Sequence, residues 1–191
     1  MSKDDLPTLG FDDAADLGRW LEAHHADAPG LWLKIPKKGG GGRGPIYDEA
    51  VDEALRFGWI DGQKGRLDDA YYLQRLTPRK PRSRWSKVNR QRAERLLDQG
   101  RMAPAGQAQV DAARGDGRWD AAYDSHRTAT VPPDLEAALD ADPAAKAFFA
   151  TLSSANRYAI LYRVEEAKRP ETRARRIEKY VAMCARGETI H

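Results

Sequence analysis

Hydrophobic residues recur at helical spacing over most of the chain. Residues 12–25 form the first such segment, and aspartates at its start can cap a helix. There Leu17, Trp20 and Leu21 stand at positions i, i+3 and i+4. Several later segments open with proline, whose missing N–H costs nothing in a first helical turn. The pattern predicts further helices over residues 48–57, 87–99, 104–114, 133–139, 143–152, 154–168 and 170–186.

Short β-rich segments lie between the first helices. The dipeptide Asp61-Gly62 has turn chemistry, and the glycine-rich stretch 37–45 predicts a flexible loop. The predicted strands are 31–35, 59–62 and 70–77, the last with Tyr71, Leu73 and Arg75 on one face and Tyr72, Gln74 and Leu76 on the other.

The order of these elements predicts an α+β fold, because strands come early and a run of helices follows. We expect a small mixed or antiparallel sheet with flanking helices in the N-terminal half, and a helical C-terminal half. Residues 1–10 are expected to be a disordered tail. Residues 11–191 are expected to form a single domain, since no long linker interrupts them. Its mixed α/β part would be 11–80 and its helical part 84–191.

Composition narrows the class of protein. The 191 residues are 41% hydrophobic, which supports a core, and a net charge of +3 is too balanced for general adhesion to nucleic acid or membrane. The single cysteine, Cys184, excludes an intrachain disulfide. No signal peptide and no apolar run of roughly 18 residues occurs, so we expect a cytoplasmic protein without membrane insertion.

The densest chemical feature is a basic tract over residues 75–95. Arginine suits bidentate contact with phosphate or carboxylate. A helix beginning near Ser86 would add free N–H groups, so Arg79, Ser83 and that helix start could hold an anion together. The alternative is a charged surface paired with acids elsewhere in the chain. The cations are Arg75, Arg79, Lys80, Arg82, Arg84, Lys87, Arg90, Arg92 and Arg95, interleaved with Ser83, Ser86 and Asn89.

Two carboxylates are the candidates for catalysis. Glu49 falls in the first turn of a predicted helix, where it can serve as a base or as a capping partner. Asp61 ends an apolar strand, where it can be a base, begin a turn, or pair with Arg75 or Arg79. The latter pairing is the interpretation we favour. The aromatic residues Tyr47, Trp59 and Trp85 would form the walls of a pocket or part of the core.

Other motifs carry less weight. Gly39, Gly41 and Gly44 match a dinucleotide fingerprint, but no further βαβ units follow, so we expect no cofactor. The histidines have no metal-ligand spacing, so we expect no metal. The arginine-rich segment 169–179 calls for an acidic partner, for which Glu136, Asp140 and Asp142, another subunit, or a second face of the anion site are all open.

Several phrases of the chain resemble a known family. The resemblance runs from about residue 11 to residue 187 and is to the YdeI/OmpD-associated, or bacteriocin-protection, family. It implies a bacterial stress protein linked with tolerance of bacteriocins or cationic antimicrobial peptides, and it implies no particular reaction. The phrases are Tyr47-x-Glu49-Ala50-Val51, Ala54-Leu55-x-Phe57-Gly58-Trp59-Ile60-Asp61-Gly62, Thr77-Pro78-Arg79-Lys80, Ser83-x-Trp85-Ser86-x-x-Asn89 and Glu171-Thr172-Arg173-x-Arg175-Arg176-Ile177.

The leading hypothesis is a protein that binds an anionic small molecule in a cleft at the junction of its two halves. One alternative is an enzyme that acts on a phosphorylated or carboxylated substrate with Asp61 or Glu49 as base. Another is a nucleic-acid or protein interaction module, and of these nucleic acid is not favoured. The expected ligand-binding residues are Tyr47, Trp59, Asp61, Arg75, Arg79, Ser83, Trp85, Ser86 and Asn89.

Overall fold

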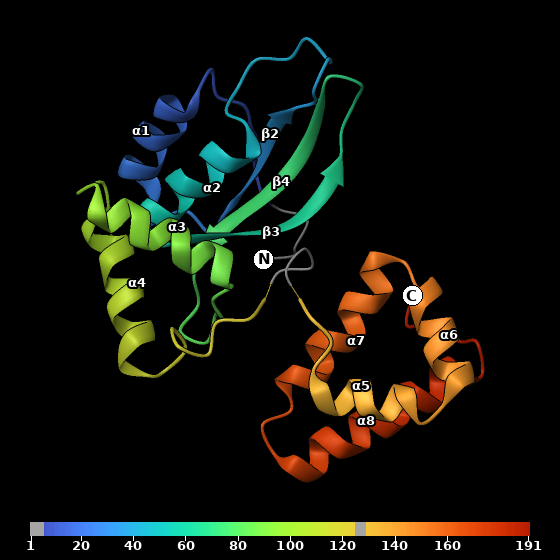
Figure 1. The fold of residues 1–191 in the computed structure, drawn as a ribbon. Helices are drawn as coiled ribbons and strands as arrows, with labels where there is room; N and C mark the ends of the chain where they lie inside the picture. The colour runs from blue at the N-terminus through green and yellow to red at the C-terminus, as the bar shows by residue number, and fades with distance from the viewer. Residues whose placement is uncertain (1–5, 125–128) are drawn as a thin grey trace. The chain divides into compact units, whose positions relative to one another are not determined.

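The computed structural model describes residues 6–124 and 129–191. The chain divides into two compact units, Met1–Ala122 and Tyr123–His191. The first contains β1 (Thr8–Leu9), α1 (Ala14–His24), β2 (Leu31–Pro36), α2 (Tyr47–Arg56), β3 (Trp59–Arg66), β4 (Tyr71–Pro78), α3 (Lys87–Asp98) and α4 (Pro104–Gly115) (Figure 1). The second contains α5 (Pro133–Asp140), α6 (Pro143–Thr151), α7 (Ser154–Glu166) and α8 (Pro170–Ala185).

The strands of the first unit form one mixed sheet in the order β1-β2-β4-β3. β1 runs parallel to β2, whereas β2 and β3 both pair antiparallel with β4. Gln74 and Leu76, predicted to share a face of β4, are both fully buried. The predicted α+β class, with a mixed sheet first and helices after it, is confirmed.

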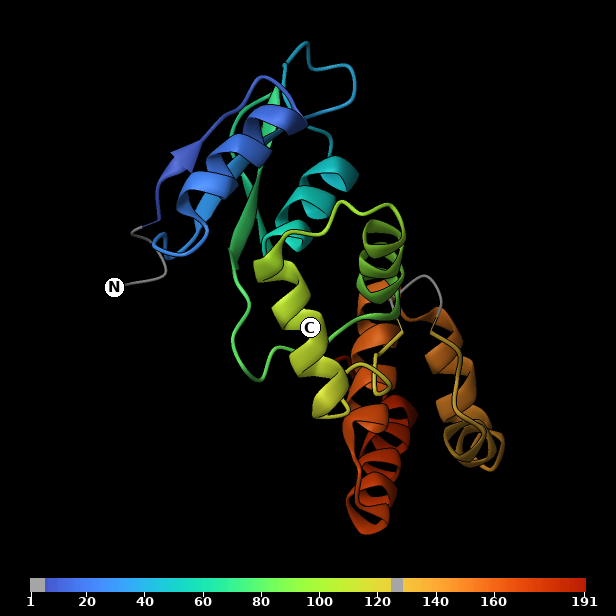
Figure 2. The same cartoon turned by 90° about the vertical axis from the view of Figure 1, so that its left-hand side faces the viewer.

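Helix α2 lies between two hydrophobic clusters. Ala50 and Ala54 pack with α1 and the sheet, while Val51 and Leu55 pack with α3 and α4. Figure 2 shows α2 between α1 and α3. Tyr47, the first residue of α2, consequently lies where β3 and α3 both approach it.

The helices of the second unit enclose a core of their own. All four contribute to it, and α8 packs against α5, α6 and α7. Cys184 is buried there, and burial raises the pKa of its thiol. The largest buried residues of this core are Leu135, Leu139, Phe149, Ile160, Leu161, Val164, Ile177, Tyr180 and Met183.

The structure differs from the sequence-based prediction at two places in the first unit. Thr8 and Leu9 pair with β2, so the end of the predicted tail is a short strand, while residues 1–5 lie outside the described part. Asp61-Gly62 is no turn, because β3 continues to Arg66 through a β-bulge between Asp61 and Lys64. The buried Gln74 amide stabilises this bulge by donating to the carbonyls of Gly62 and Gln63. That residues 11–191 act as a single domain stays a prediction.

Candidate functional site

Three of the predicted site residues meet in one hydrogen-bonded group, the Asp61 network. The Tyr47 hydroxyl donates to Asp61 Oδ2 at 2.7 Å, and Asn89 Nδ2 donates to Asp61 Oδ1 at 3.3 Å. The three side chains come from α2, α3 and β3, and all are half-buried. Both carboxylate oxygens thus have a donor, and the start of α3 is fixed relative to the sheet.

Aromatic rings and a lysine surround this network. Lys64 Nζ lies 4.9 Å from the Tyr47 ring centroid and 5.1 Å from that of Tyr72. Burial raises the pKa of Tyr47 well above its usual range, and the Asp61 carboxylate raises it further by repulsion and by accepting the hydrogen bond. Burial likewise raises the pKa of Tyr72, with a smaller contribution from Asp48. Tyr47 therefore acts as a protonated donor near neutral pH.

Tyr47→Phe is expected to lower the free energy of unfolding by about 1.5 kcal/mol at pH 7, since a hydrogen bond to a charged acceptor is lost. A pKa raised by folding stabilises the protein below the unfolded pKa, about 10 for tyrosine, and that stabilisation is lost as pH rises further. The difference in the free energy of unfolding between wild type and Tyr47→Phe should therefore become smaller above pH 10. Urea denaturation from pH 7 to 11 measures this difference. If the difference did not change with pH, the raised pKa of Tyr47 in the folded protein would be contradicted.

The predicted pairing of Asp61 with an arginine is not found among the described residues. Asp61 lies directly across from Leu76 in the β3–β4 ladder, so it shares a face of the sheet with Leu76. Arg75 is the next residue along β4 and points to the opposite face. Its Nε is buried and has no hydrogen-bond partner in the described part of the chain. The other predicted partner, Arg79, stacks on Trp85.

Glu49 and Trp59 occupy structural positions. The Glu49 carboxylate is exposed and accepts from the backbone N–H of Ile46, so it satisfies a backbone donor at the start of α2. Trp59 is fully buried in the core beside the sheet, and its indole N–H donates to the carbonyl of His25. Trp59 lies in the core rather than in the wall of an open pocket.

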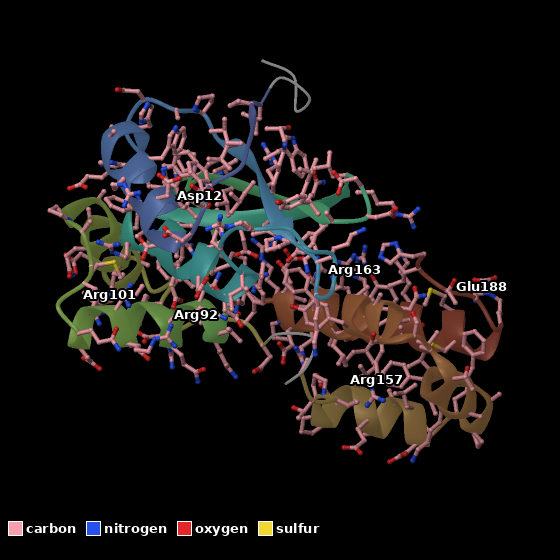
Figure 3. The ribbon with its side chains drawn as sticks, turned by 90° about the horizontal axis from the view of Figure 1, so that it is seen from above. Asp12, Arg92, Arg101, Arg157, Arg163 and Glu188 are labelled. Carbon is pink, nitrogen blue, oxygen red and sulfur yellow. The ribbon has the colours of Figure 1, made fainter. Side chains whose placement is uncertain are left out.

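The basic tract divides into paired and unpaired cations. Arg92 lies on α3 (Figure 3) and bonds to Asp48 and Asp52. On the same helix Arg95 bonds to Asp52, and Arg90 Nε lies 3.6 Å from Glu94 Oε1. The alternative of a surface paired with acids therefore holds for this helix. Lys80 and Arg82, in the preceding loop, are exposed and have no ion pair within the described residues.

The loop from Arg79 to Ser86 has a well-defined internal structure. Arg79 is only 6% exposed, and its guanidinium carbon lies 3.6 Å from the Trp85 ring centroid. Its Nη1 donates to the carbonyl of Arg84. Ser83 Oγ accepts from the backbone N–H of Lys80, so residues 80–83 make a tight turn. Its carbonyl accepts from Arg118.

At the end of this loop α3 begins as predicted. Ser86 is the N-cap, with its hydroxyl accepting from the backbone N–H of Asn89, and the first turn of the helix contains no acidic residue. The cap leaves the positive end of the helix dipole close to the basic loop.

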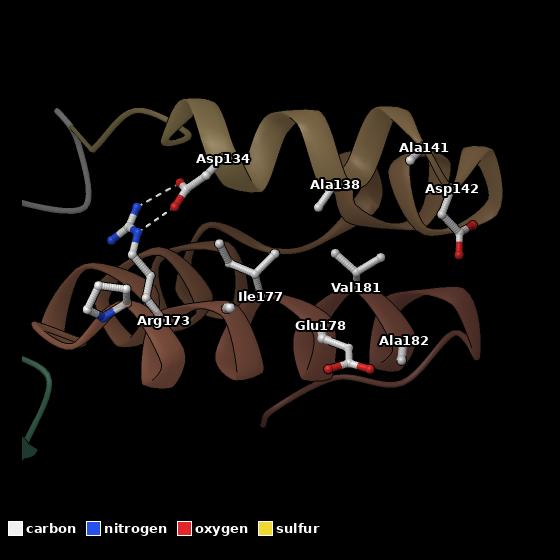
Figure 4. A pocket seen from close by; sticks show the side chains of 11 residues that line it. Asp134, Ala138, Ala141, Asp142, Arg173, Ile177, Glu178, Val181 and Ala182 are labelled. Atoms are coloured by element: carbon white, nitrogen blue, oxygen red, sulfur yellow. Dashed lines mark hydrogen bonds and ion pairs between the residues drawn. The ribbon is translucent and has the colours of Figure 1, made fainter.

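The second unit has a groove of about 650 Å³ between α5 and α8 (Figure 4). At one end, Asp134 and Arg173 form a bidentate pair, and Arg173 holds the pKa of the Asp134 carboxyl below its usual range. Of the acidic partners left open for the arginine-rich segment, an acidic helix of this chain thus supplies one for Arg173, although the residue is Asp134 rather than Glu136, Asp140 or Asp142. Besides Asp134 and Arg173, the groove is lined by Ala138, Ala141, Asp142, Pro170, Ala174, Ile177, Glu178, Val181 and Ala182.

Each of the two units matches a protein family model. Residues 9–109 match a domain of unknown function (DUF8412), and residues 128–187 match the family described as bacteriocin-protection, YdeI or OmpD-associated. The second unit of the chain belongs to the bacteriocin-protection family. The first unit carries the DUF8412 domain, which spans more than half of the chain. No curated protein and no solved structure is significantly similar to the chain.

The family match confirms the resemblance to the bacteriocin-protection family over residues 128–187, whereas residues 9–109 match the DUF8412 domain. The phrase over residues 171–177 lies in the part that matches the family by name, while the phrases between 47 and 89 lie in the DUF8412 part. The groove between α5 and α8 belongs to the former part. Sequence reasoning missed this groove, although the helical spacing of its lining residues on α8, with Ala174 and Ala182 exposed, could have indicated it.

Two general features complete the description of the chain. None of the helices in the described ranges has the length and apolar character of a membrane span. Over the same ranges, no three histidine, cysteine, aspartate or glutamate residues are grouped as metal ligands would be.

Proposed function

We propose that this protein binds an anionic group of a small molecule, a phosphate or carboxylate, at the loop between β4 and α3. The observation that carries the proposal is the exposure of Lys80 and Arg82 beside a helix start without acids. Two cations without ion pairs within the described residues, and the positive end of a helix, favour an anion at the same place. Arginine adds planar, bidentate contact with an oxyanion.

The internal structure of the loop supports this proposal. Because Arg79 is stacked on Trp85 and Ser83 is bonded on both sides, the backbone that presents the two cations is already ordered. A preorganised site loses less conformational entropy on binding than a mobile one. In this proposal Arg79, Ser83 and Trp85 shape the site, while Lys80 and Arg82 contact the anion.

The Asp61 network contributes to the same proposed site indirectly, because it holds the start of α3. Asn89 follows Ser86 by three residues in the first turn of α3, and its amide is held by Asp61. Tyr47 holds Asp61 from the other side. The network thereby keeps the helix start at a fixed position on the sheet, which preserves the geometry of the loop before it.

The double variant Lys80→Ala/Arg82→Ala is expected to bind inorganic phosphate or citrate at least tenfold more weakly than wild type, a loss of about 1.4 kcal/mol. Isothermal titration calorimetry at low and high salt measures this. The matched control is Lys38→Ala/Arg43→Ala, which removes two exposed cations from the glycine-rich loop. Arg79→Ala is unsuitable, because it removes a buried side chain and would disturb folding.

Two results would contradict the proposal. One is unchanged affinity in the Lys80→Ala/Arg82→Ala variant, or an equal loss in the control. The other is binding to every polyanion, including a short oligonucleotide, that disappears at high salt, since this indicates a nonspecific surface rather than a site for one chemical group.

A further inference from the structure

We infer that the groove between α5 and α8 binds a positively charged amphipathic helix of a peptide or protein partner. Its lining on α8 begins at Pro170 and ends at Ala182 and forms one stripe at helical spacing. At about 1.5 Å per residue this stripe is roughly 18 Å long, enough for about three turns of a partner helix. Asp134 and Ala138 on α5, with Ala141 directly after it, form the facing stripe.

The lining is suited to a helix because it is apolar and shallow. Ile177 and Val181 extend toward Ala138 across the gap, as Figure 4 shows, and make an apolar floor. Ala141, Ala174 and Ala182 are exposed and small, so a helix backbone can come close between α5 and α8. Apolar side chains of a partner at i, i+4 and i+7 would then enter the groove, the arrangement used by helix-in-groove interfaces.

The charges at the groove select a cationic partner. Asp134 and Arg173 neutralise each other at one end. Asp142 and Glu178 have no ion pair among the described residues, although Asp142 also caps α6 by accepting from the backbone N–H of Ala145, so the lining of the groove keeps a net negative charge. The neighbouring cations Arg175 and Lys179 are not part of its lining. Lysine or arginine beside the apolar stripe of a partner would therefore pair with these carboxylates, while an acidic helix would be repelled.

The test uses the full chain and a fluorescein-labelled leucine–lysine peptide of about 14 residues, roughly four helical turns. Its controls are a scrambled peptide of the same composition and a leucine–glutamate version. Fluorescence anisotropy should show saturable binding of the amphipathic cationic peptide, with at least tenfold weaker binding of both controls. Equal binding of the scrambled peptide would overturn the proposal, because only charge would then be recognised.

Variants on α8 locate the binding. Ala182→Arg puts bulk and positive charge into the groove, and Glu178→Lys reverses one of its free charges; each should weaken binding at least tenfold. The matched controls are Ala185→Arg and Glu171→Lys, exposed positions of the same helix outside the lining, which should leave affinity unchanged. Circular dichroism verifies that all four variants fold.

Two outcomes overturn the inference. Unchanged peptide affinity in Ala182→Arg and Glu178→Lys would remove the groove from the binding surface. If size-exclusion chromatography instead shows a dimer of the wild type that Ala182→Arg dissociates, the groove is occupied by a second copy of this chain. Neither result bears on the anion site, which lies in the first unit.

Discussion

Replacing Arg56 and Arg101 together with alanine is expected to lower the free energy of unfolding by about 3 kcal/mol, the cost of leaving a buried charge without partners. The charge is that of Glu53, which is 4% exposed within α2. Arg56 Nη1 bonds to its Oε2, and Arg101 Nη2 lies 3.2 Å from its Oε1. Each oxygen of the Glu53 carboxylate has one guanidinium partner, so the double substitution removes both partners.

Two comparisons test whether the unpaired charge of Glu53 causes the loss of stability. Each single variant leaves one guanidinium on Glu53 and should lose less than half of the total. Adding Glu53→Gln to the double variant should restore part of the stability, because a neutral amide costs less to bury than a carboxylate. Urea denaturation provides all four values. Additive single losses, or no recovery with glutamine, would show that packing rather than charge is responsible.

Glu53 illustrates what a linear pattern does not reveal. The sequence predicts the helix over residues 48–57 but does not indicate that Glu53 is buried in it. Its burial depends on Gly18 of α1, because a Cβ there would lie 2.7 Å from Glu53 Oε2. It also depends on Arg101, which is far along the chain. The approach of three segments, none adjacent in sequence, creates the buried position.

Local signals succeeded wherever the physics is local. The cap at Ser86 and the helices opening at Pro104, Pro133, Pro143 and Pro170 lie where predicted, since capping and the first turn involve only a few neighbouring residues. The prediction of a turn at Asp61-Gly62 was wrong because the structure there depends on residues distant in sequence. Pairing with β4 and the buried amide of Gln74 override the turn preference of those two residues.

The basic tract shows the same limit at the level of the candidate site. The sequence identifies nine cations, but their partners decide which of them can meet a ligand. Asp48 and Asp52, on α2, neutralise Arg92 and Arg95, and the aromatic ring of Trp85 covers Arg79. The proposed anion site is accordingly narrower than the tract and shifts to the loop before α3.

The last prediction concerns the close approach of α4 to the end of α2 in the first unit. Gly106→Ala is expected to lower the free energy of unfolding by about 3 kcal/mol, at the upper end for overpacking. A Cβ on Gly106 would lie 2.3 Å from the carbonyl oxygen of Arg56 and 2.7 Å from that of Leu55, so α4 and the end of α2 would have to separate. Backbone atoms cannot move aside as a flexible side chain can, and the cluster containing Val110 would be disturbed.

Gly115→Ala is the matched control, because Gly115 ends the same helix and a Cβ there would meet nothing within 4 Å. This variant should stay within about 0.5 kcal/mol of wild type, as surface substitutions usually do. Thermal and urea unfolding of both variants make the comparison. Similar stability of the two alanine variants would mean that α2 and α4 do not approach as closely as described. A selective loss in Gly106→Ala would confirm that the close approach of α4 positions α2, and with it Tyr47 and the Asp61 network.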